Sequence, residues 1–197
     1  HSDNFITEAC EYTNSFLKFN PSLEIILNIE EDHLDFFKDL DDIRHSFHKF
    51  AGNTADNGVL ILNGTIKNPD EITKGLTCKV VTYGLSGNET YYASDISYNE
   101  KGCASFQANG AGHTFHVMLN VPGSHNVQNA MAAIAFALEA GFDDSIIIRG
   151  LQSFGGTKRR FEIKGHLGDI TVVDDYAHHP TEIAATLTAA HNYPHNR

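Results

Sequence analysis

The sequence has 197 residues, of which 41% are hydrophobic, enough for the core of one large domain or of one domain with part of another. Acidic side chains outnumber basic ones by 25 to 14, and the resulting formal charge of −11 argues against a nucleic-acid-binding surface. The three cysteines lack CxxC spacing, so neither a disulfide framework nor a cysteine zinc site is expected. No apolar run has the length of a membrane span and no signal peptide is recognisable, so we expect a cytoplasmic protein without a membrane partner.

The first half of the sequence alternates between predicted strands and one long predicted helix. Apolar and β-branched runs predict strands at residues 4–9, 23–28, 59–64 and 78–84. The helix carries an apolar face at helical spacing, made of Leu40, Ile43, Phe47 and Phe50. Asp39 is its expected N-cap and Gly52 its expected stop. Such alternation favours an α/β fold with a mostly parallel sheet.

The second half begins with a different pattern, in which short alternating runs between Tyr91 and Val121 predict antiparallel hairpins. A helical pattern returns at Val127, Met131, Ile134 and Leu138, and Gly141 is its expected stop. A shorter helix is expected from Asp143 to Arg149. Near the end, Ile170–Val173 predicts a buried strand, and Pro180 is suited to the first turn of a helix.

Acidic and histidine side chains follow three of the predicted strands. Glu8 closes the first strand, Asp32 and His33 follow the second, and the segment "DDYAHHPTEI" (174–183) follows the last. Ligands of open α/β sheets bind outside the carboxyl ends of strands, so a Mg²⁺ site is possible here, although each residue could equally be a solvated loop residue or a helix cap. A zinc site is disfavoured because adjacent His178 and His179 point in diverging directions.

Two further segments carry groups suited to a nucleotide. Ser124 is a natural N-cap, and Asn126 and Asn129 share one side of the helix that follows, where their amides could contact a purine edge or only the backbone. The segment 154–161, "FGGTKRRF", places three cations beside two glycines and favours a phosphate contact, with its two phenylalanines expected to be buried and to hold the turn. The sequence contains no Gly-x-x-x-x-Gly-Lys-Ser/Thr phosphate loop.

Taken together, these segments resemble the Mur ligases, the ATP-dependent ligases of peptidoglycan synthesis. The resemblance runs along the whole chain and is carried by "EACEYTNSFL" (8–17), "LNIEEDHLDFF" (27–37), "GSHNVQNAMAAIAFALEAG" (123–141), "SFGGTKRRFE" (153–162) and "DDYAHHPTEI" (174–183). The chain departs from it at Cys10, where many relatives have an acid two residues after the glutamate. The "AHHPTE" form indicates the branch that joins L-alanine to UDP-N-acetylmuramate.

The resemblance implies a three-domain enzyme of which this chain is a fragment, inactive by itself. Residues 1–163 would form the central ATP-binding domain without its phosphate loop, an α/β fold with a mostly parallel sheet, flanking helices and a small antiparallel section. Residues 164–197 would form the first strand and helix of a Rossmann-like C-terminal domain. A ligase that joins the same precursor to a ready-made tripeptide, and a non-enzymatic module that binds nucleotide or a protein partner, remain as alternatives.

The resemblance also implies ATP and Mg²⁺ as cofactors and a set of residues that bind them. The implied residues are Glu8 and His33 for Mg²⁺; Asn126 and Asn129 for adenine, with His125 nearby; Arg160 for the γ-phosphate; Asp175 for the ribose; and Tyr176 and His178 for the amino acid and the acyl group. Of these, Arg160 and His178 would take part in catalysis.

Overall fold

The structure is a computed structural model that describes residues 4–194, and the chain divides into two compact units, His1–Thr82 and Tyr83–Arg197. The strands are β1 (Leu23–Ile26), β2 (Val59–Asn63), β3 (Lys79–Gly84), β4 (Tyr91–Tyr98), β5 (Cys103–Gly110), β6 (His113–Pro122), β7 (Glu162–Leu167) and β8 (Ile170–Asp174). The helices are the 3₁₀ helix η1 (Tyr12–Lys18) and the α-helices α1 (Leu40–Ala51), α2 (Asp70–Thr73), α3 (His125–Glu139), α4 (Asp144–Ser153) and α5 (Pro180–Asn192). None of the helices described between residues 4 and 194 is long and apolar enough to cross a membrane.

The expected α/β fold is confirmed. Strands β1 to β6 are hydrogen-bonded in sequence order, with β1 parallel to β2, β3 parallel to β4, and the pairs β4–β5 and β5–β6 antiparallel. The antiparallel part is the predicted hairpin region, whereas β7 and β8 form a separate two-stranded antiparallel sheet. The parallel β1–β2 pair follows from the crossover through α1, because a tight turn can only return the chain antiparallel.

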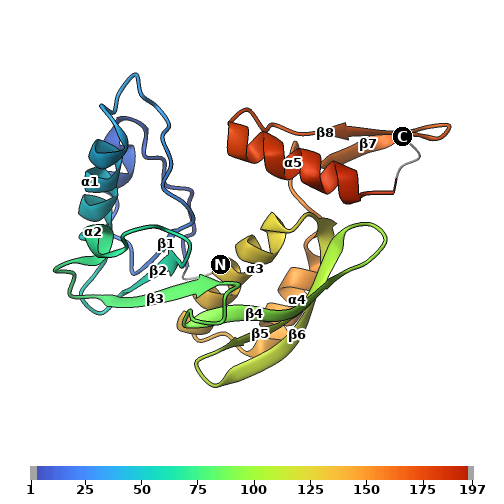
Figure 1. The fold of residues 1–197 in the computed structure, drawn as a ribbon. Coiled ribbons are helices and arrows are strands. Elements are labelled where there is room, and N and C mark those ends of the chain that lie inside the picture. Colours follow the sequence, from blue (N-terminus) through green and yellow to red (C-terminus); the bar gives the residue numbers. More distant parts are fainter. Residues whose placement is uncertain (1–3, 195–197) are drawn as a thin grey trace. The chain divides into compact units, whose positions relative to one another are not determined.

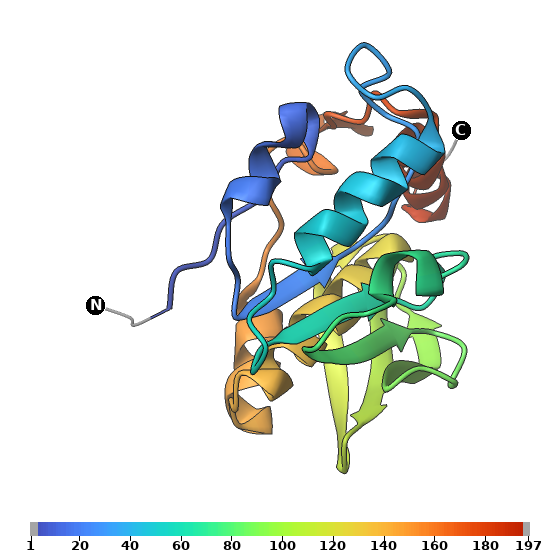
Figure 2. The same cartoon turned by 90° about the vertical axis from the view of Figure 1, so that its left-hand side faces the viewer.

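In the first unit, helix α1 packs against β1 and β2, as Figure 2 shows. The helix begins where predicted, with the Asp39 carboxylate accepting a hydrogen bond from the Asp42 amide at 2.9 Å, and it ends at Gly52. Strand β2 is buried along its whole length, as its apolar run Val59–Leu62 indicates, and the burial includes the polar Asn63 at its end. The core between helix and strands is made of Ile26, Ala51, Leu60, Leu62, Ile72 and Cys78.

The prediction of a strand at residues 4–9 is wrong. Residues 4–10 have no regular secondary structure, and the side chains of Phe5 and Ile6 are 85% and 75% exposed. An apolar run forms a strand only beside a neighbour that pairs with its backbone, and no described strand pairs with it. The chain is first anchored after this segment, at η1, where the buried Phe16 ring stacks on Phe50 at 4.6 Å.

In the second unit, helices α3 and α4 cover one face of the β4–β5–β6 meander (Figure 1). The predicted stripe of α3 is buried at Val127, Met131 and Ile134, and Gly141 follows the helix end with a φ of +80°, which a residue with a side chain rarely adopts. Helix α4 begins at Asp144 and continues to Ser153, one turn beyond its predicted end at Arg149.

The C-terminal segment contains one strand that the sequence did not predict. Strand β7 pairs with β8, which confirms the strand at 170–173 but not its burial, since Ile170 and Val172 are 62% and 49% exposed. A sheet of two strands leaves both edges and most of its faces open, so the β-branched run finds little to pack against. Helix α5 starts with Pro180 in its first turn, as expected.

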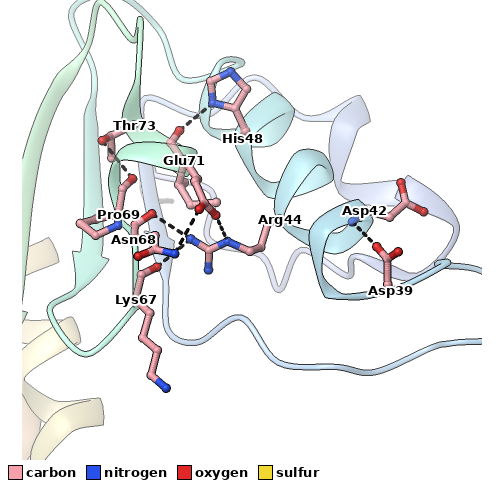
Figure 3. A network of polar contacts seen from close by, with 10 residues as sticks. Asp39, Asp42, Arg44, His48, Lys67, Asn68, Pro69, Glu71 and Thr73 are labelled. Carbon is pink, nitrogen blue, oxygen red and sulfur yellow. Dashed lines mark hydrogen bonds and ion pairs between the residues drawn. The ribbon is translucent and has the colours of Figure 1, made fainter.

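A buried arginine joins α1 to the loop after β2. The Arg44 side chain is 8% exposed; its Nη2 donates to the carbonyls of Lys67 and Asn68 at 2.6 and 2.8 Å, and its Nε donates to Glu71 (Figure 3). Asn68 has a φ of +47°, so the guanidinium holds a loop that is locally strained.

We expect Arg44→Met to lower the free energy of unfolding by about 2–3 kcal/mol, because two inward-facing carbonyls and a carboxylate lose their donor. Arg44→Lys should recover only part of this loss, since an ammonium cannot reproduce the planar fork. Urea denaturation of the three proteins measures the effect, with the exposed Arg149→Met as the control, which should change stability by less than about 0.5 kcal/mol. A loss equal to that control would contradict the role of Arg44.

Candidate functional site

In the first unit, two carboxylates surround the imidazole of His33. The His33 Nε2 atom lies 3.6 Å from Glu11 Oε1 and 3.8 Å from Asp32 Oδ2, and one ligand atom from each residue lies within 4.8 Å of the others. Glu11 directly precedes η1, and the other two follow β1. Two hard oxygen donors with one imidazole suit a small divalent cation such as Mg²⁺ or Mn²⁺.

Of the two predicted metal ligands, His33 belongs to this cluster. Glu8 is exposed and lies outside it, so its assignment stays a prediction. The sequence reasoning missed Glu11, although it is part of the quoted segment "EACEY" and is separated from Glu8 by only two residues. No signal in the sequence marks Glu11, because it is brought to the loop after β1 by a 3₁₀ turn whose kink at Thr13 and Asn14 is a feature of the fold.

In the second unit, the start of α3 brings the predicted adenine residues together. Asn129 Nδ2 donates to Asn126 Oδ1 at 3.3 Å, and Asn126 Nδ2 donates to the Pro122 carbonyl at 2.7 Å. The two amides therefore lie side by side, as the three-residue spacing predicts, and one of them is already fixed to the backbone. Ser124 occupies the N-cap position but makes no side-chain cap hydrogen bond, because its backbone is already helical at φ −64° and ψ −31°.

Gly123 lies directly under the ring of His125. Its φ is +101°, and a Cβ atom placed there would lie 2.5 Å from His125 Cε1 and 2.9 Å from Nδ1. Burial lowers the pKa of His125 and the Arg160 charge lowers it too, and together they outweigh the raising effect of the Asp175 carboxylate, so the neutral imidazole is favoured. The glycine is thus required both by its backbone angle and by the close approach of the ring.

We expect Gly123→Ala to cost about 1–3 kcal/mol of stability and to displace the His125 ring. Gly112→Ala is the matched control, because Gly112 also has a positive φ, +86°, but nothing lies within 4 Å of its Cβ position. The difference in thermal unfolding between the two variants isolates the contact with His125, whose proton shifts should change only in the first variant. Equal destabilisation and unchanged histidine shifts would contradict this contact.

The basic turn and the histidine turn are joined through the carboxylate of Asp175. Its Oδ2 accepts from the Phe161 amide and its Oδ1 from the Ala177 amide, both at 2.8 Å, and the Tyr176 amide donates to the Arg159 carbonyl at 2.8 Å. Burial raises the pKa of Asp175, but the hydrogen bonds from the Ala177 and Phe161 amides lower it by more. The pKa of this carboxyl therefore lies below its usual range. Asp175 is therefore an ionised carboxylate that ties one turn to the other.

The cations of the basic turn lie over Tyr176. The Arg159 guanidinium is 4.2 Å from the Tyr176 ring centre and that of Arg160 is 5.8 Å away. Glu182, in the first turn of α5, lies 3.5 Å from Arg160 Nη1 and 3.7 Å from His178 Nδ1. The sequence reasoning did not single out Glu182, whose place three residues into the helix is typical of a capping carboxylate.

The predicted phosphate, ribose and acceptor residues thus gather on two connected turns. One expectation about these turns is wrong: Phe154 does not bury and hold the basic turn, because its side chain is 47% exposed. The turn is held by backbone hydrogen bonds to Asp175 and by the half-buried Phe161, whose ring lies 5.8 Å from Tyr193. A hollow of about 480 Å³ lies at the starts of β6 and α4, beside His113 and Asp144. None of the residues predicted to bind cofactor, metal or substrate lines it.

Comparisons with known families give two matches. The Mur ligase middle domain matches residues 1–137, and the Mur ligase, glutamate ligase domain matches residues 159–197. The expected boundary between residues 163 and 164 stays a prediction.

Among curated proteins, the chain is 55% identical over all 197 residues to the UDP-N-acetylmuramate–L-alanine ligase of Agathobacter rectalis and 51% identical to that of Clostridium botulinum strain Hall. The chain spans 43% of the length of each of these relatives.

Solved structures of related enzymes share the fold. The chain resembles MurF from Acinetobacter baumannii with a TM-score of 0.81 and 26% identity, covering 91% of this chain and 39% of that one. The UDP-N-acetylmuramate–alanine ligase MurC from Thermotoga maritima aligns with a TM-score of 0.75 and 31% identity, covering 91% and 40% of the two chains.

Proposed function

Since this chain belongs to the Mur ligase family, we propose that the protein containing it is an ATP-dependent ligase that joins L-alanine to UDP-N-acetylmuramate. The observation that carries the proposal is the 55% identity along the whole chain to a ligase of that name. The gathering of Arg160, Asp175, Tyr176 and His178 on two connected turns supports it, because these are the residues that the family resemblance assigns to nucleotide and acceptor.

The proposed reaction has two displacements. The carboxylate of UDP-N-acetylmuramate attacks the γ-phosphorus of ATP and ADP leaves, which gives an acyl phosphate. The amine of L-alanine then attacks the acyl carbon, phosphate leaves, and the nitrogen gives up a proton. Both steps spread negative charge over phosphoryl or carbonyl oxygens, so the protein acts chiefly by positioning the reactants and stabilising that charge.

In this scheme each side chain has a definite task. Arg160, which is half exposed, offers its guanidinium to the γ-phosphate, and Asn126 and Asn129 meet the adenine. Asp175 keeps the two turns joined and presents its remaining lone pairs to the ribose. His178 Nδ1 lies 3.1 Å from the Tyr176 carbonyl and donates to it, which leaves Nε2 to accept the proton of the attacking amine.

The donor set around His33 fits Mg²⁺, and we propose that Glu11 and Asp32 act there with His33, together with Glu8 from the family resemblance. The cation supplies positive charge to the phosphate oxygens when it is bound. Within the cluster, the Asp32 carboxylate is oriented by the hydrogen bond that its Oδ1 accepts from the His33 amide at 2.7 Å.

ADP release by the intact protein tests the proposal. We expect continued ADP formation over many turnovers only when UDP-N-acetylmuramate and L-alanine are both present, and none from the 197 residues alone, which contain no phosphate loop. A tripeptide offered in place of L-alanine distinguishes the recycling ligase. A clear preference for the tripeptide, or no ADP with either acceptor, would overturn the assignment.

A further inference from the structure

The three side chains of the candidate cation cluster come from two separate chain segments. Glu11 stands at the start of η1, whereas Asp32 and His33 lie on the loop that follows β1. A cation site needs its ligands held in a fixed geometry before the ion arrives, because side chains that must first be ordered bind more weakly. Some group must therefore fix the two segments against each other.

Tyr12, next to Glu11, makes contacts that join these segments. Its ring packs on the His33 imidazole with a centroid distance of 4.6 Å and an interplanar angle of 32°. Its hydroxyl donates to Asp35 Oδ2 at 2.8 Å, and its ring meets the edge of Phe36 at 6.1 Å. One side chain of the first segment thus contacts three residues of the second.

Both partners of this contact are attached to the core. Four residues after Tyr12, the ring of Phe16 is 1% exposed and packs on Phe47 and Phe50 of α1. On the other segment, Phe37 is 2% exposed, and its amide donates to the His33 carbonyl at 2.9 Å. The Tyr12–His33 pair is therefore anchored on both sides, by Phe16 on one segment and by Phe37 on the other.

Besides the Tyr12 ring, the described residues give the His33 side chain only the approaches of its Nε2 to Glu11 and Asp32, at 3.6 and 3.8 Å. Its backbone is left-handed, with a φ of +53°, and its amide donates to Asp32 Oδ1 at 2.7 Å. These features set where the side chain begins but leave its two side-chain torsions free to rotate. The nitrogen that faces Glu11 and Asp32 is Nε2, so the Tyr12 ring rests on an imidazole already turned toward the two carboxylates.

We propose that Tyr12 is a positioning residue for the cation site: by stacking on His33 and anchoring its hydroxyl on Asp35, it holds His33 Nε2 toward Glu11 and Asp32. The inference rests on the proposed function, in which this cluster binds a divalent cation. Residues that orient a metal ligand from outside typically contribute tenfold to a hundredfold to metal affinity. The ring supplies the stacking surface, and the hydroxyl fixes the ring, so both parts of tyrosine are used.

Mn²⁺ binding to the intact protein, followed by electron paramagnetic resonance, tests the proposal. We expect Tyr12→Ala to weaken Mn²⁺ binding about tenfold and Tyr12→Phe, which keeps the ring, to weaken it only a few-fold. Selective ¹³C labelling of histidine gives a readout that needs no metal. The His33 resonance, assigned by its loss in His33→Ala, should show a ring-current shift and restricted motion that disappear in Tyr12→Ala and are largely kept in Tyr12→Phe.

Two controls separate the possible failures. Tyr98→Phe removes a phenolic hydroxyl that is also exposed, and it should change neither readout. If His33→Ala abolishes Mn²⁺ binding while Tyr12→Ala binds as tightly as the unaltered protein, the positioning role is overturned and the metal assignment stands. If the unaltered protein binds no Mn²⁺, or binds it equally well with His33→Ala, the metal assignment and this inference are both overturned.

Discussion

Replacing Arg160 by alanine in the intact protein is expected to lower kcat/KM for ATP by about 10²–10³-fold, the usual cost of removing one charged stabiliser of a phosphoryl transition state. The guanidinium is half exposed, and its contacts are a 3.5 Å approach to Glu182 and the ring of Tyr176 at 5.8 Å. Neither contact buries its charge, so substitution should leave the fold nearly unchanged. The loss should therefore appear in activity and not in stability.

Two matched variants define the origin of that loss. Arg160→Lys keeps the charge without the bidentate fork, and we expect it to recover part of kcat but not the full activity. Arg149→Ala removes an exposed arginine from α4 and should have no effect. Steady-state kinetics with varied ATP measure all three proteins. Activity of Arg160→Ala within threefold of the unaltered protein would remove Arg160 from the phosphate site.

The parts of the fold that the sequence predicted are those fixed by local pattern. Asp39 and Gly52 mark the ends of α1, and the apolar stripe from Val127 to Leu138 marks α3, because caps and helical spacing act within a few residues. The three-residue spacing of Asn126 and Asn129 likewise placed their amides side by side. These are properties of one element and need no knowledge of its neighbours.

The parts that the sequence did not predict depend on partners far along the chain. Residues 4–9 look like a strand but have no described strand beside them, and β7 forms only because β8 pairs with it. The same holds for the candidate site: Glu11 reaches His33 through a turn whose kink at Thr13 and Asn14, with φ values of 55° and 58°, leaves no composition signal. Strand pairing and turn geometry depend on tertiary contacts, so they are difficult to predict from a single sequence.

Glu24 was also missed, although strand alternation places it on the same face of β1 as buried Ile26. Its side chain is 3% exposed; Oε2 accepts from Thr54 Oγ1 at 2.8 Å, and buried Oε1 has no hydrogen-bond partner among the described residues. Burial raises the pKa of Glu24 to about 7, and the Thr54 hydrogen bond offsets only part of this shift. The carboxyl is also near Cys78, whose own pKa is raised by burial and then by the charge of Glu24.

We therefore expect the free energy of unfolding to fall by about 3 kcal/mol as the pH rises from 4.5 to above 7, because the unfolded chain loses this proton first and the folded chain keeps it. Below pH 4.5 the carboxyl is protonated in both states and the cost disappears. Glu24→Gln, which can still accept from Thr54, should remove this pH dependence and be more stable by up to about 3 kcal/mol at pH 8.

Urea denaturation of the chain at pH 4.5, 6 and 8 measures the difference between the two proteins at each pH. Glu100→Gln, which neutralises an exposed carboxylate in the β4–β5 turn, should leave the same curve unchanged within about 0.5 kcal/mol. Two proteins of equal stability at pH 8 would mean that Glu24 reaches solvent or a cation when it ionises. A higher stability of Glu24→Gln at pH 8, which we expect, identifies Glu24 as a carboxyl that the fold keeps protonated near neutral pH. The reason is that its Oε2 has a hydrogen-bond donor and its buried Oε1 has none among the described residues.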